Sequence, residues 1–287
     1  MIHTIVEKIA RDFGFERTFY IDPSFEKTGY NLPAFTKTIL VLVRSYIPHR
    51  IDEPIPAYYL ASNSSYHAGN AFVSKLRGMG ARTERSHVPV IPLLLNAKIG
   101  VIGRNGLLRL KGLGSRTVLT TFVTELCEPL QVYEPCEECG GCSLCVRACL
   151  TSAITMNGID YKRCIRWHMG TACHPDFVKK VLPGFLGCEI CQAVCPQNAM
   201  VGTKEPDDDV KAAFDLLRLI RGDASAARLL VGRNQSSNGK LIAEAITIAA
   251  KRGVYADAIR AGSDSCFEAV RDAVRWADGI LTNRFNL

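Results

Sequence analysis

The sequence predicts a mixed α/β protein in three parts along its 287 residues. Residues 1–130 alternate between helical and β-rich apolar patterns, which is typical of an α/β domain. Residues 131–203 contain most of the cysteines, and residues 204–287 follow a helical period. Because a typical domain has ~100–200 residues, a chain of this length is expected to form more than one unit.

Apolar spacing predicts the elements of the first part. Three apolar residues recur at helical intervals before Gly14, and two short runs rich in β-branched residues indicate buried strands. A further apolar stretch contains Pro89 and Pro92 and is expected to be partly irregular. The expected elements are helices over 5–13 and 65–78, strands over 38–44 and 118–124, and the irregular stretch over 88–95.

The third part is predicted to be helical. It follows the polar linker 202–209, and its apolar residues recur every three or four positions. A capping box, Ser265-Cys-Phe-Glu268, marks the start of the last helix. The expected helices cover 210–220, 241–253 and 265–281.

The cysteines carry the strongest signal in the chain. Eleven of the twelve lie between Cys127 and Cys195. The run 139–149 has the spacing Cys-x2-Cys-x2-Cys-x3-Cys, and the run 188–195 repeats it without its first member and ends before a proline. Such runs are typical of ferredoxin-like modules with two [4Fe–4S] clusters, in which the fourth cysteine of each run ligates the other cluster.

This rule assigns four thiolates to each cluster, with one position left open. Cys164, in Arg163-Cys164-Ile165, is the predicted replacement for the missing member of the second run. Cys136, three residues before Cys139, is an alternative that shifts the ligand set by one step. The predicted ligands are Cys139, Cys142, Cys145 and Cys195 for the first cluster, and Cys149, Cys164, Cys188 and Cys191 for the second.

Disulfides and zinc are the competing interpretations of these cysteines. Disulfide frameworks concentrate in small secreted chains, and the first ten residues are charged and amphipathic rather than a signal peptide. Zinc usually takes two separated pairs of ligands, which two interlocked runs do not provide. No apolar run approaches the ~20 residues that cross a membrane. We therefore expect a cytoplasmic protein with no membrane contact.

Basic residues gather between 98 and 116, where five lysines and arginines occur without an acidic residue. The formal net charge of the whole chain is +7. Such a stretch forms either a solvated basic face or a site for an anionic partner, such as a cofactor tail or nucleic acid. The residues are Lys98, Arg104, Arg109, Lys111 and Arg116.

The order of the motifs resembles the cobalamin-dependent epoxyqueuosine reductases and, more distantly, the reductive dehalogenases. A glycine-rich stretch from Gly100 to Leu108 comes first, then Gly114-Ser115 and Thr124-Glu125-Leu126, and then the two cysteine runs. The resemblance covers roughly residues 1–200. It also includes the segments 39–48, 65–67, 161–165 and 187–198.

The resemblance implies a fold and a path for electrons. A corrinoid would sit in a nitroreductase-like α/β domain, beside the dicluster module, with a short HEAT-like helical tail. A low-potential donor such as ferredoxin or flavodoxin would supply electrons, and the protein would position the cofactor and exclude water. The substrate would be a small molecule or a nucleic acid, with tRNA as one candidate.

The same resemblance implies the site residues. Glu84 stands near the position of the family's aspartate general acid, a role that burial favours by raising a carboxyl pKa. His87 and Tyr66 are alternatives, and a surface glutamate between two arginines is the competing interpretation. Gly100, Gly103 and Arg104 are expected to line a cavity. The implied cobalamin contacts are Tyr66, His67, Gly100, Gly103, Arg104, Asn105, Gly106 and Ser115.

Two further functions remain open from the sequence. The first is an electron-transfer or reductive-activation protein that acts on a protein partner without substrate chemistry of its own. The second is an α/β domain that binds a flavin or has lost its cofactor. Binding of a corrinoid distinguishes the reductase from both.

Overall fold

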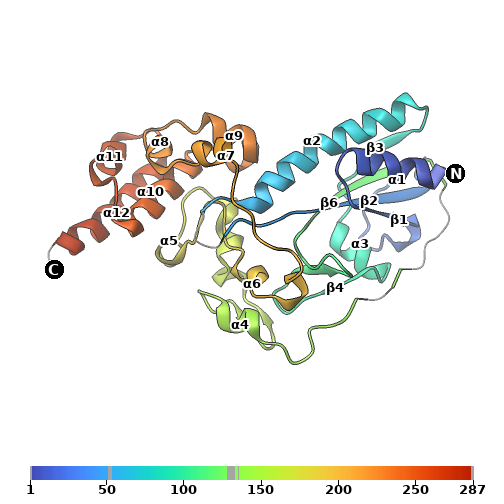
Figure 1. The fold of residues 1–287 in the computed structure, drawn as a ribbon, viewed down its shortest axis with the longest axis horizontal. Coiled ribbons are helices and arrows are strands. Elements are labelled where there is room, and N and C mark those ends of the chain that lie inside the picture. Colours follow the sequence, from blue (N-terminus) through green and yellow to red (C-terminus); the bar gives the residue numbers. More distant parts are fainter. Residues whose placement is uncertain (1, 51–53, 128–132, 135, 286–287) are drawn as a thin grey trace. The chain divides into compact units, whose positions relative to one another are not determined.

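The computed structural model describes residues 2–50, 54–127, 133–134 and 136–285, which form two compact units (Figure 1). The first unit consists of Met1–Tyr46, Ala61–Cys142 and Pro196–Met200, and the second of Ile47–Leu60, Ser143–Cys195 and Val201–Leu287. The expected boundary at residues 130 and 131 lies outside the described residues, and the division into three parts stays a prediction.

The first unit is built on a four-stranded antiparallel sheet in the order β1-β2-β6-β3. Its central strands are the two apolar runs that the sequence predicted. In β2, Ile39, Val41 and Val43 face one side and Leu40 and Leu42 the other, and all five are buried. The strands are β1 (Arg17–Ile21), β2 (Thr38–Ser45), β3 (Thr83–Arg85) and β6 (Thr117–Thr124).

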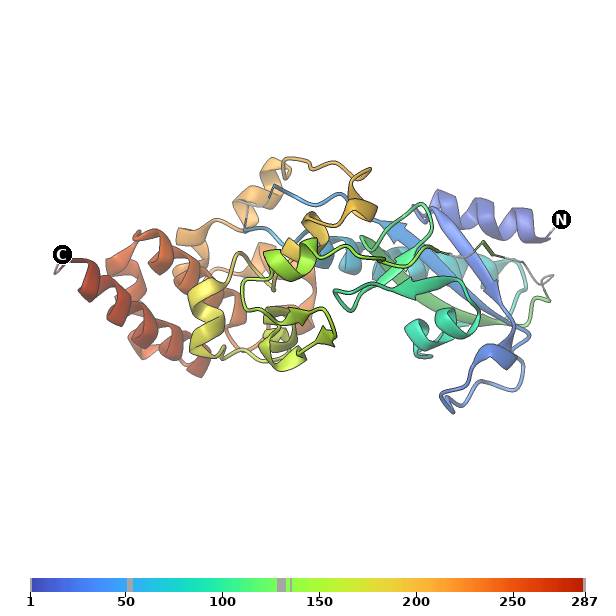
Figure 2. The ribbon, with the colours of Figure 1, turned by 90° about the horizontal axis from the view of Figure 1, so that it is seen from below.

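Helices cover both faces of this sheet (Figures 1 and 2). On one face, α1 (Ile2–Asp12) and α2 (Ala57–Gly78) pack against Leu40, Leu42 and Phe122. On the other, α3 (Val90–Asn96) and the hairpin of β4 (Gly100–Ile102) and β5 (Leu108–Leu110) pack against Val41 and Val123. The glycine-rich stretch therefore lies on the face opposite α1 and α2.

The second unit combines the cysteine segment with the C-terminal helices. Short elements separate the cysteines, and longer helices form the apolar core. The elements are α4 (Leu144–Ala148), β7 (Ile154–Thr155), β8 (Gly158–Ile159), α5 (Asp176–Val181), α6 (Ile190–Ala193), α7 (Asp208–Ala213), α8 (Leu216–Ile220), α9 (Ser225–Val231), α10 (Lys240–Arg252), α11 (Ala256–Arg260) and α12 (Glu268–Phe285).

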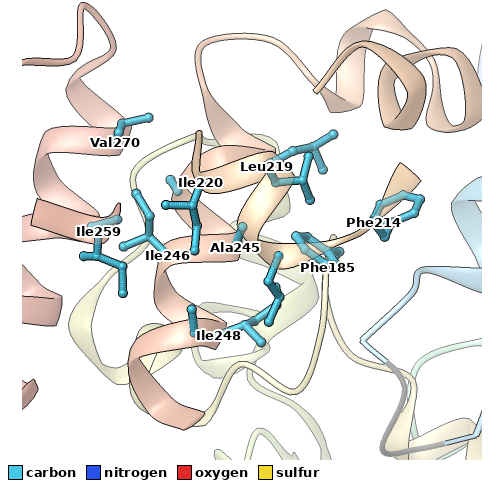
Figure 3. Packing of buried hydrophobic residues seen from close by; sticks show 14 of the residues in the cluster. Phe185, Phe214, Leu219, Ile220, Ala245, Ile246, Ile248, Ile259 and Val270 are labelled. Atoms are coloured by element: carbon cyan, nitrogen blue, oxygen red, sulfur yellow. The ribbon is translucent and has the colours of Figure 1, made fainter. Parts of the chain in front are cut away.

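Helix α10 is the centre of the C-terminal core. Ala245 and Ile246 are fully buried, and Leu219 and Ile259 pack into the same cluster from α8 and α11 (Figure 3). The helix ends at Gly253, whose φ of 74° is the left-handed conformation typical of a helix C-terminus.

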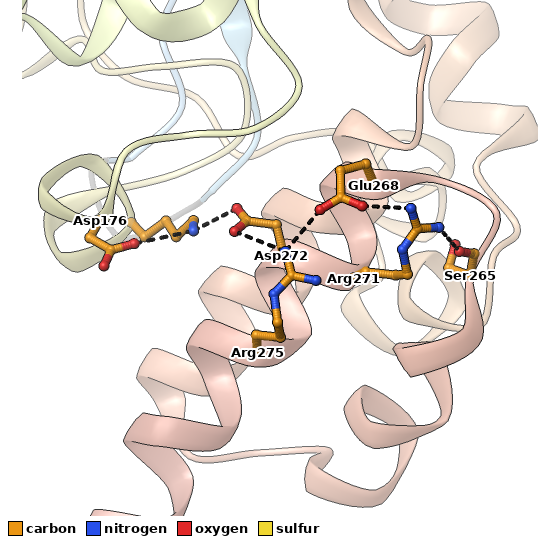
Figure 4. Close-up of polar contacts among 7 residues, drawn as sticks. Asp176, Ser265, Glu268, Arg271, Asp272 and Arg275 are labelled. Carbon is orange, nitrogen blue, oxygen red and sulfur yellow. Dashed lines mark hydrogen bonds and ion pairs between the residues drawn. The ribbon is translucent and has the colours of Figure 1, made fainter.

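An ion pair connects α12 with α5, and further pairs lie beside it. The Lys179 ammonium is 5% exposed and lies 2.6 Å from an Asp272 carboxylate oxygen and 3.3 Å from Asp176. Arg275 pairs with Asp272 and Glu268 on the surface of α12 (Figure 4). Because Lys179 is buried, removing its carboxylate partner would cost more stability than breaking an exposed pair, since the ammonium would be left buried and uncompensated.

One sequence prediction of local structure was wrong, and two others differ from the structure in extent. The stretch 88–95 contains the regular helix α3, because Pro92 falls in its first turn, where no backbone N–H is needed. The helix expected over 210–220 is split in two, since Asp215 accepts the Arg218 N–H and caps α8. Helix α2 begins at Ala57, eight residues before the expected start at Ser65.

No helix in the described part of the chain is long and apolar enough to cross a membrane.

Candidate functional site

The glycine-rich stretch folds into the β4–β5 hairpin. Gly100 pairs with Leu110 and Ile102 with Leu108, so the loop between them forms the turn. The Gly103 N–H donates to Leu107 O at 2.8 Å, and Gly106 takes a φ of 73° that other residues rarely adopt. The sequence left two roles for these glycines, a tight turn or a close approach of the backbone to a ligand. Gly106 has the first role.

Gly100 and Gly103 pack against their own hairpin. A Cβ on Gly100 would lie 2.7 Å from Arg109 O, and one on Gly103 would lie 2.8 Å from Asn105 Oδ1. Asn105 is 6% exposed, and its Oδ1 accepts the Leu107 N–H. The side of each glycine that a Cβ would occupy is therefore taken up by its own hairpin, and the cavity expected at Gly100, Gly103 and Arg104 stays a prediction.

Arg104 connects the hairpin to the first cysteine loop. Its backbone N–H lies 3.3 Å from Cys139 Sγ, within the range of a hydrogen bond to sulfur. Its guanidinium donates from Nε to Cys142 O at 3.1 Å and from Nη2 to Gly140 O at 3.0 Å. Arg104 thus contacts the loop that carries two predicted ligands of the first cluster.

Ser115 makes a second connection, to the segment after Cys195. Asn198 Oδ1 accepts the Ser115 N–H at 2.8 Å, and Asn198 Nδ2 donates to Ser115 Oγ at 3.1 Å. Gly114 has a φ of 64°, and a Cβ there would overlap Asn198 Oδ1. Sequence reasoning missed the role of Asn198, although the resemblance reached that residue.

The basic stretch 98–116 is largely used inside the protein. Arg109 is 2% exposed and donates to Glu137 O, and Arg116 is 4% exposed. Lys111 pairs with Glu134, and Arg104 binds the cysteine loop. The stretch is neither a solvated face nor an open anion site, because four of its five cations are buried or paired within the chain.

Tyr66 and His67 lie on α2, and both side chains are exposed. Arg85 stacks on the Tyr66 ring at 4.7 Å, on the sheet face that carries α1 and α2. Helix α2 and the β4–β5 hairpin cover opposite faces of the sheet, so these two sets of predicted contacts come from different layers.

Glu84 lies on the edge strand β3, opposite Val123. Cross-strand partners share a face, so Glu84 lies on the face of α3 and the hairpin. Its carboxylate is 41% exposed and lies 3.6 Å from Arg82 Nε. This is the arrangement of the competing interpretation, a surface glutamate beside an arginine, and its role in proton transfer stays a prediction.

The predicted ligands of the second cluster come together within the second unit. Burial raises the pKa of Cys188 to about 11, and the charges of Cys164 and Cys149 add to the increase. Burial also opposes ionisation of Cys149, but N–H groups of Thr151 and Ile154 lower its pKa overall. A buried thiol such as Cys188 becomes a ligand only where a metal compensates the charge of its thiolate.

Tyr58, at the start of α2, contacts the chain near Cys164 and near Cys188. The Arg166 guanidinium stacks over the Tyr58 ring at 4.2 Å, two residues after Cys164. The Tyr58 N–H donates to Glu189, which follows Cys188. This arrangement holds the loops of Cys164 and Cys188 against the same short segment.

The remaining predicted ligands lie on or beside short helices. Cys145 is buried on α4, which packs against α6, where Cys191 lies. Cys195 follows α6 and precedes the segment of Asn198. Among the described residues, no group of three or more His, Cys, Asp or Glu is arranged to hold a single metal ion. A cubane cluster differs from such a site because each thiolate binds a different iron.

Comparisons with known proteins agree with this site. Residues 138–198 match the family model of the 4Fe-4S double cluster binding domain, which confirms the prediction of two [4Fe–4S] clusters. The epoxyqueuosine reductase of Staphylococcus aureus is 34% identical over 115 residues, which are 39% of this chain and 30% of that protein. That of Leadbetterella byssophila is 28% identical over 204 residues, 62% of this chain and 66% of that protein.

The fold is similar to that of a solved epoxyqueuosine reductase over a longer stretch of the chain. The structure of epoxyqueuosine reductase from Streptococcus thermophilus superposes with a TM-score of 0.71 and 18% identity, and covers 98% of this chain and 90% of that one. In sequence, the chain spans between 30% and 66% of the length of the two relatives described above. The chain is therefore similar to the epoxyqueuosine reductases in sequence and in fold, and its cysteine segment matches the double-cluster domain.

Proposed function

We propose that this chain is an iron–sulfur reductase of the epoxyqueuosine reductase type. Electrons would pass through two [4Fe–4S] clusters to a cobalamin that reduces a substrate. The contact between Arg104 and the cysteine loop carries this proposal. The hairpin that the resemblance assigns to the cobalamin is hydrogen-bonded to Cys139, a predicted ligand of the first cluster.

The chain's own residues have separate tasks in this function. The two groups of four cysteines hold the clusters, which supply one-electron carriers of low potential when bound. Arg104 and Asn198 keep the loops of the first cluster at the hairpin. We propose that Cys164, and not Cys136, completes the second cluster, since Ile165, the residue after it, packs in the same apolar cluster as Cys188.

The cobalamin contact is proposed at the turn of the hairpin, and not at Gly100 and Gly103. Ile102 is 43% exposed, and Gly106 and Leu107 are partly accessible. A bound cobalamin would supply a metal centre that transfers electrons to the substrate. The nitroreductase-like character of the sheet domain and the HEAT-like character of the helical tail are part of the same proposal.

The substrate is proposed to be a modified nucleoside in tRNA. An epoxyqueuosine reductase with 18% identity to this chain has been solved with an epoxyqueuosine-modified tRNA-Tyr stem loop, at a TM-score of 0.70. Glu84 is the candidate proton donor, and the exposed position of its carboxylate leaves it accessible to a large substrate.

A second candidate function is favoured by the packing of the hairpin. Because protein atoms occupy the side of Gly100 and Gly103 that a side chain would take, these glycines serve packing within the hairpin, and the chain would then pass electrons to a protein partner without a corrinoid. Both functions need the two clusters, so cluster content does not distinguish them. Binding of cobalamin does.

The test is an anaerobic titration of the reconstituted protein with cob(II)alamin, followed by EPR. The reductase predicts tight binding and an altered cobalt signal. Ile102→Glu should weaken binding by placing a charge at the turn, whereas Ile91→Glu, at a similarly exposed isoleucine of α3, should leave it unchanged. An unaltered cobalt signal with about eight irons bound would exclude the cobalamin-dependent reductase and favour the electron-transfer function.

A further inference from the structure

Two large aromatic side chains are exposed beside Cys164. Tyr161 is 51% exposed and Trp167 is 61% exposed, and their ring centroids lie 5.7 Å apart. Tryptophan is highly buried on average, and clustered aromatic residues on a surface are enriched at binding interfaces. The pair therefore indicates a contact surface at this point of the cysteine segment.

The backbone around Cys164 holds this pair in place. The Cys164 N–H donates to Tyr161 O and the Trp167 N–H donates to Cys164 O, both at 3.0 Å. Asp160 accepts the Lys162 N–H at 3.0 Å and begins the turn. The predicted cluster ligand is thus the centre of a turn that carries an aromatic residue on each side.

Two cations lie between the first aromatic residue and the cysteine. Lys162 and Arg163 are exposed, and neither forms an ion pair with any residue that the structure describes. Arg166, by contrast, is stacked on Tyr58 and Tyr59. Lys162 and Arg163 are therefore accessible to an acidic partner, and their charge would accelerate its approach.

We propose that the segment Tyr161–Trp167 is the docking surface for an acidic, one-electron carrier protein of the ferredoxin or flavodoxin class. The inference rests on the proposed function, since it takes Cys164 as a ligand of the second cluster. One electron leaves the reduced centre of the carrier and enters that cluster, so the carrier is oxidised and the cluster reduced by one electron each. No proton or other group is transferred.

The proposed order of the two clusters in the electron path supports entry of electrons at the segment Tyr161–Trp167. The first cluster's loop is hydrogen-bonded to Arg104 on the hairpin, where the acceptor is proposed. Entry is then expected at the other cluster, whose ligand Cys164 lies between the exposed aromatic residues. A small surface of this kind suits weak, transient contacts between redox proteins, which bury less than ~1,200 Å².

The test measures reduction of the clusters in the anaerobic holoprotein by reduced ferredoxin or flavodoxin, using stopped-flow absorbance. The double variant Lys162→Glu/Arg163→Glu should lower the second-order rate at least tenfold at low salt, with a smaller difference at high salt. The matched control Arg228→Glu/Arg233→Glu makes the same charge change at exposed residues of the C-terminal part and should keep the wild-type rate. Trp167→Ala should lower the rate at all salt concentrations.

The iron content should be unchanged in every variant, because the clusters themselves are intact. The potential of each variant is measured by redox titration and the rates are compared at equal driving force, because charges near a ligand affect the potential. The proposal is overturned if the carrier reduces the double variant at the wild-type rate, or if the control variant slows equally. It is also overturned if the double variant loses tRNA binding while its reduction by the carrier is unaffected. A failure to bind cobalamin leaves these rates untouched, since the measurement ends at the clusters.

Discussion

At the scale of single residues, the site depends on side chains that connect loops distant in sequence. Arg104 contacts Cys139, Gly140 and Cys142, some 35 residues further along the chain. Hydrogen bonds to ligand sulfurs stabilise the more negative, reduced cluster and so raise its potential. Arg104 therefore contributes both to holding the loop and to the potential of the first cluster.

Replacing Arg104 tests the contribution of its side chain. Arg104→Ala removes two hydrogen bonds from a charged donor, each worth about 1.5–3 kcal/mol, and should loosen the loop, whereas the main-chain N–H that points at Cys139 Sγ is retained. Because a positive charge beside the loop is lost, we expect a lower potential and faster loss of the first cluster in air, measured by EPR-monitored redox titration. Arg104→Lys should have an intermediate potential and an intermediate rate of cluster loss. It keeps the positive charge, but one ammonium cannot donate to both carbonyl oxygens as the guanidinium does. An unchanged potential in Arg104→Ala would contradict the role.

The choice between Cys164 and Cys136 is also testable at this scale. Cys164→Ala should reduce the iron content from about eight to about four per chain, because the residue after Cys164 packs in the same apolar cluster as Cys188. Cys136→Ala should retain about eight, as should the control Cys266→Ala at an exposed cysteine of the helical region. Loss of a cluster in Cys136→Ala alone would reverse the assignment.

At the scale of elements, α10 supports the loops of the second cluster through two buried charged residues. Glu244 is fully buried and accepts the Leu186 N–H at 2.9 Å, two residues before Cys188. Its other oxygen lies 2.9 Å from His174 Nε2. One turn earlier, the Lys240 ammonium donates to Met169 O in the loop that follows Cys164.

Removing the Glu244 carboxylate should therefore destabilise the second unit. Glu244→Ala leaves the Leu186 N–H and His174 without a partner, and we expect a loss of about 3–5 kcal/mol. Glu244→Gln keeps an acceptor and should lose less. Anaerobic chemical denaturation of the holoprotein measures both. Glu268→Ala, in an exposed ion pair of α12, is the control and should unfold close to the wild type; equal stability of Glu244→Ala would contradict the role.

Tyr133, which is hydrogen-bonded to the edge strand β1, is expected to make stability depend on pH. The Tyr20 N–H donates to the Tyr133 hydroxyl at 2.9 Å, and burial raises the pKa of Tyr133 to about 12. An unfolded tyrosine titrates near pH 10, so above that pH the unfolded chain releases a proton that the folded chain retains. The free energy of unfolding should therefore fall as the pH rises from about 10 to 12. In Tyr133→Phe it should fall less over the same pH range. Identical alkaline unfolding curves would contradict this.

At the scale of the whole molecule, the two units differ in what stabilises them. The first has a buried sheet, and the C-terminal helices have a large apolar core. The cysteine segment has a small one, formed by Ile165, Met169, Val178 and Leu182. Metal clusters replace apolar burial in such segments, and their binding contributes to folding.

Removing the clusters should then unfold the molecule unevenly. After oxidation and chelation of the iron, amide exchange in residues 149–170 should rise more than tenfold, which corresponds to about 1.4 kcal/mol of lost protection. Strands β2 and β6 and helix α10 should keep their protection. Hydrogen exchange with mass spectrometry makes the comparison, and uniform loss of protection would show that the clusters support the entire fold.

Patterns within short windows predicted much of the molecule. The cysteine runs indicated the cluster domain, and apolar spacing indicated α1, β2, β6 and α10. Contacts between distant segments were not predictable, because nothing in the local sequence of Arg104 or Ser115 specifies Gly140 or Asn198 as a partner. The glycines at 100 and 103 were assigned to a ligand for the same reason, since the atoms that fill their space come from residues 105–110.

The two connections at Arg104 and Ser115 have a consequence for how the cysteine segment can vary. The chain leaves the hairpin region near Cys142 and returns to it at Gln197, and both points are fixed within the short stretch from Arg104 to Ser115. The segment between them is a loop with closed ends, and doubling the length of such a loop costs only about 0.6 kcal/mol. Insertions in its exposed turns would leave the sheet unstrained, whereas its contacts with α10 through Leu186 and Met169 limit how much of it can be exchanged. The electron-carrying part can therefore vary more in length than in the residues that contact the helices.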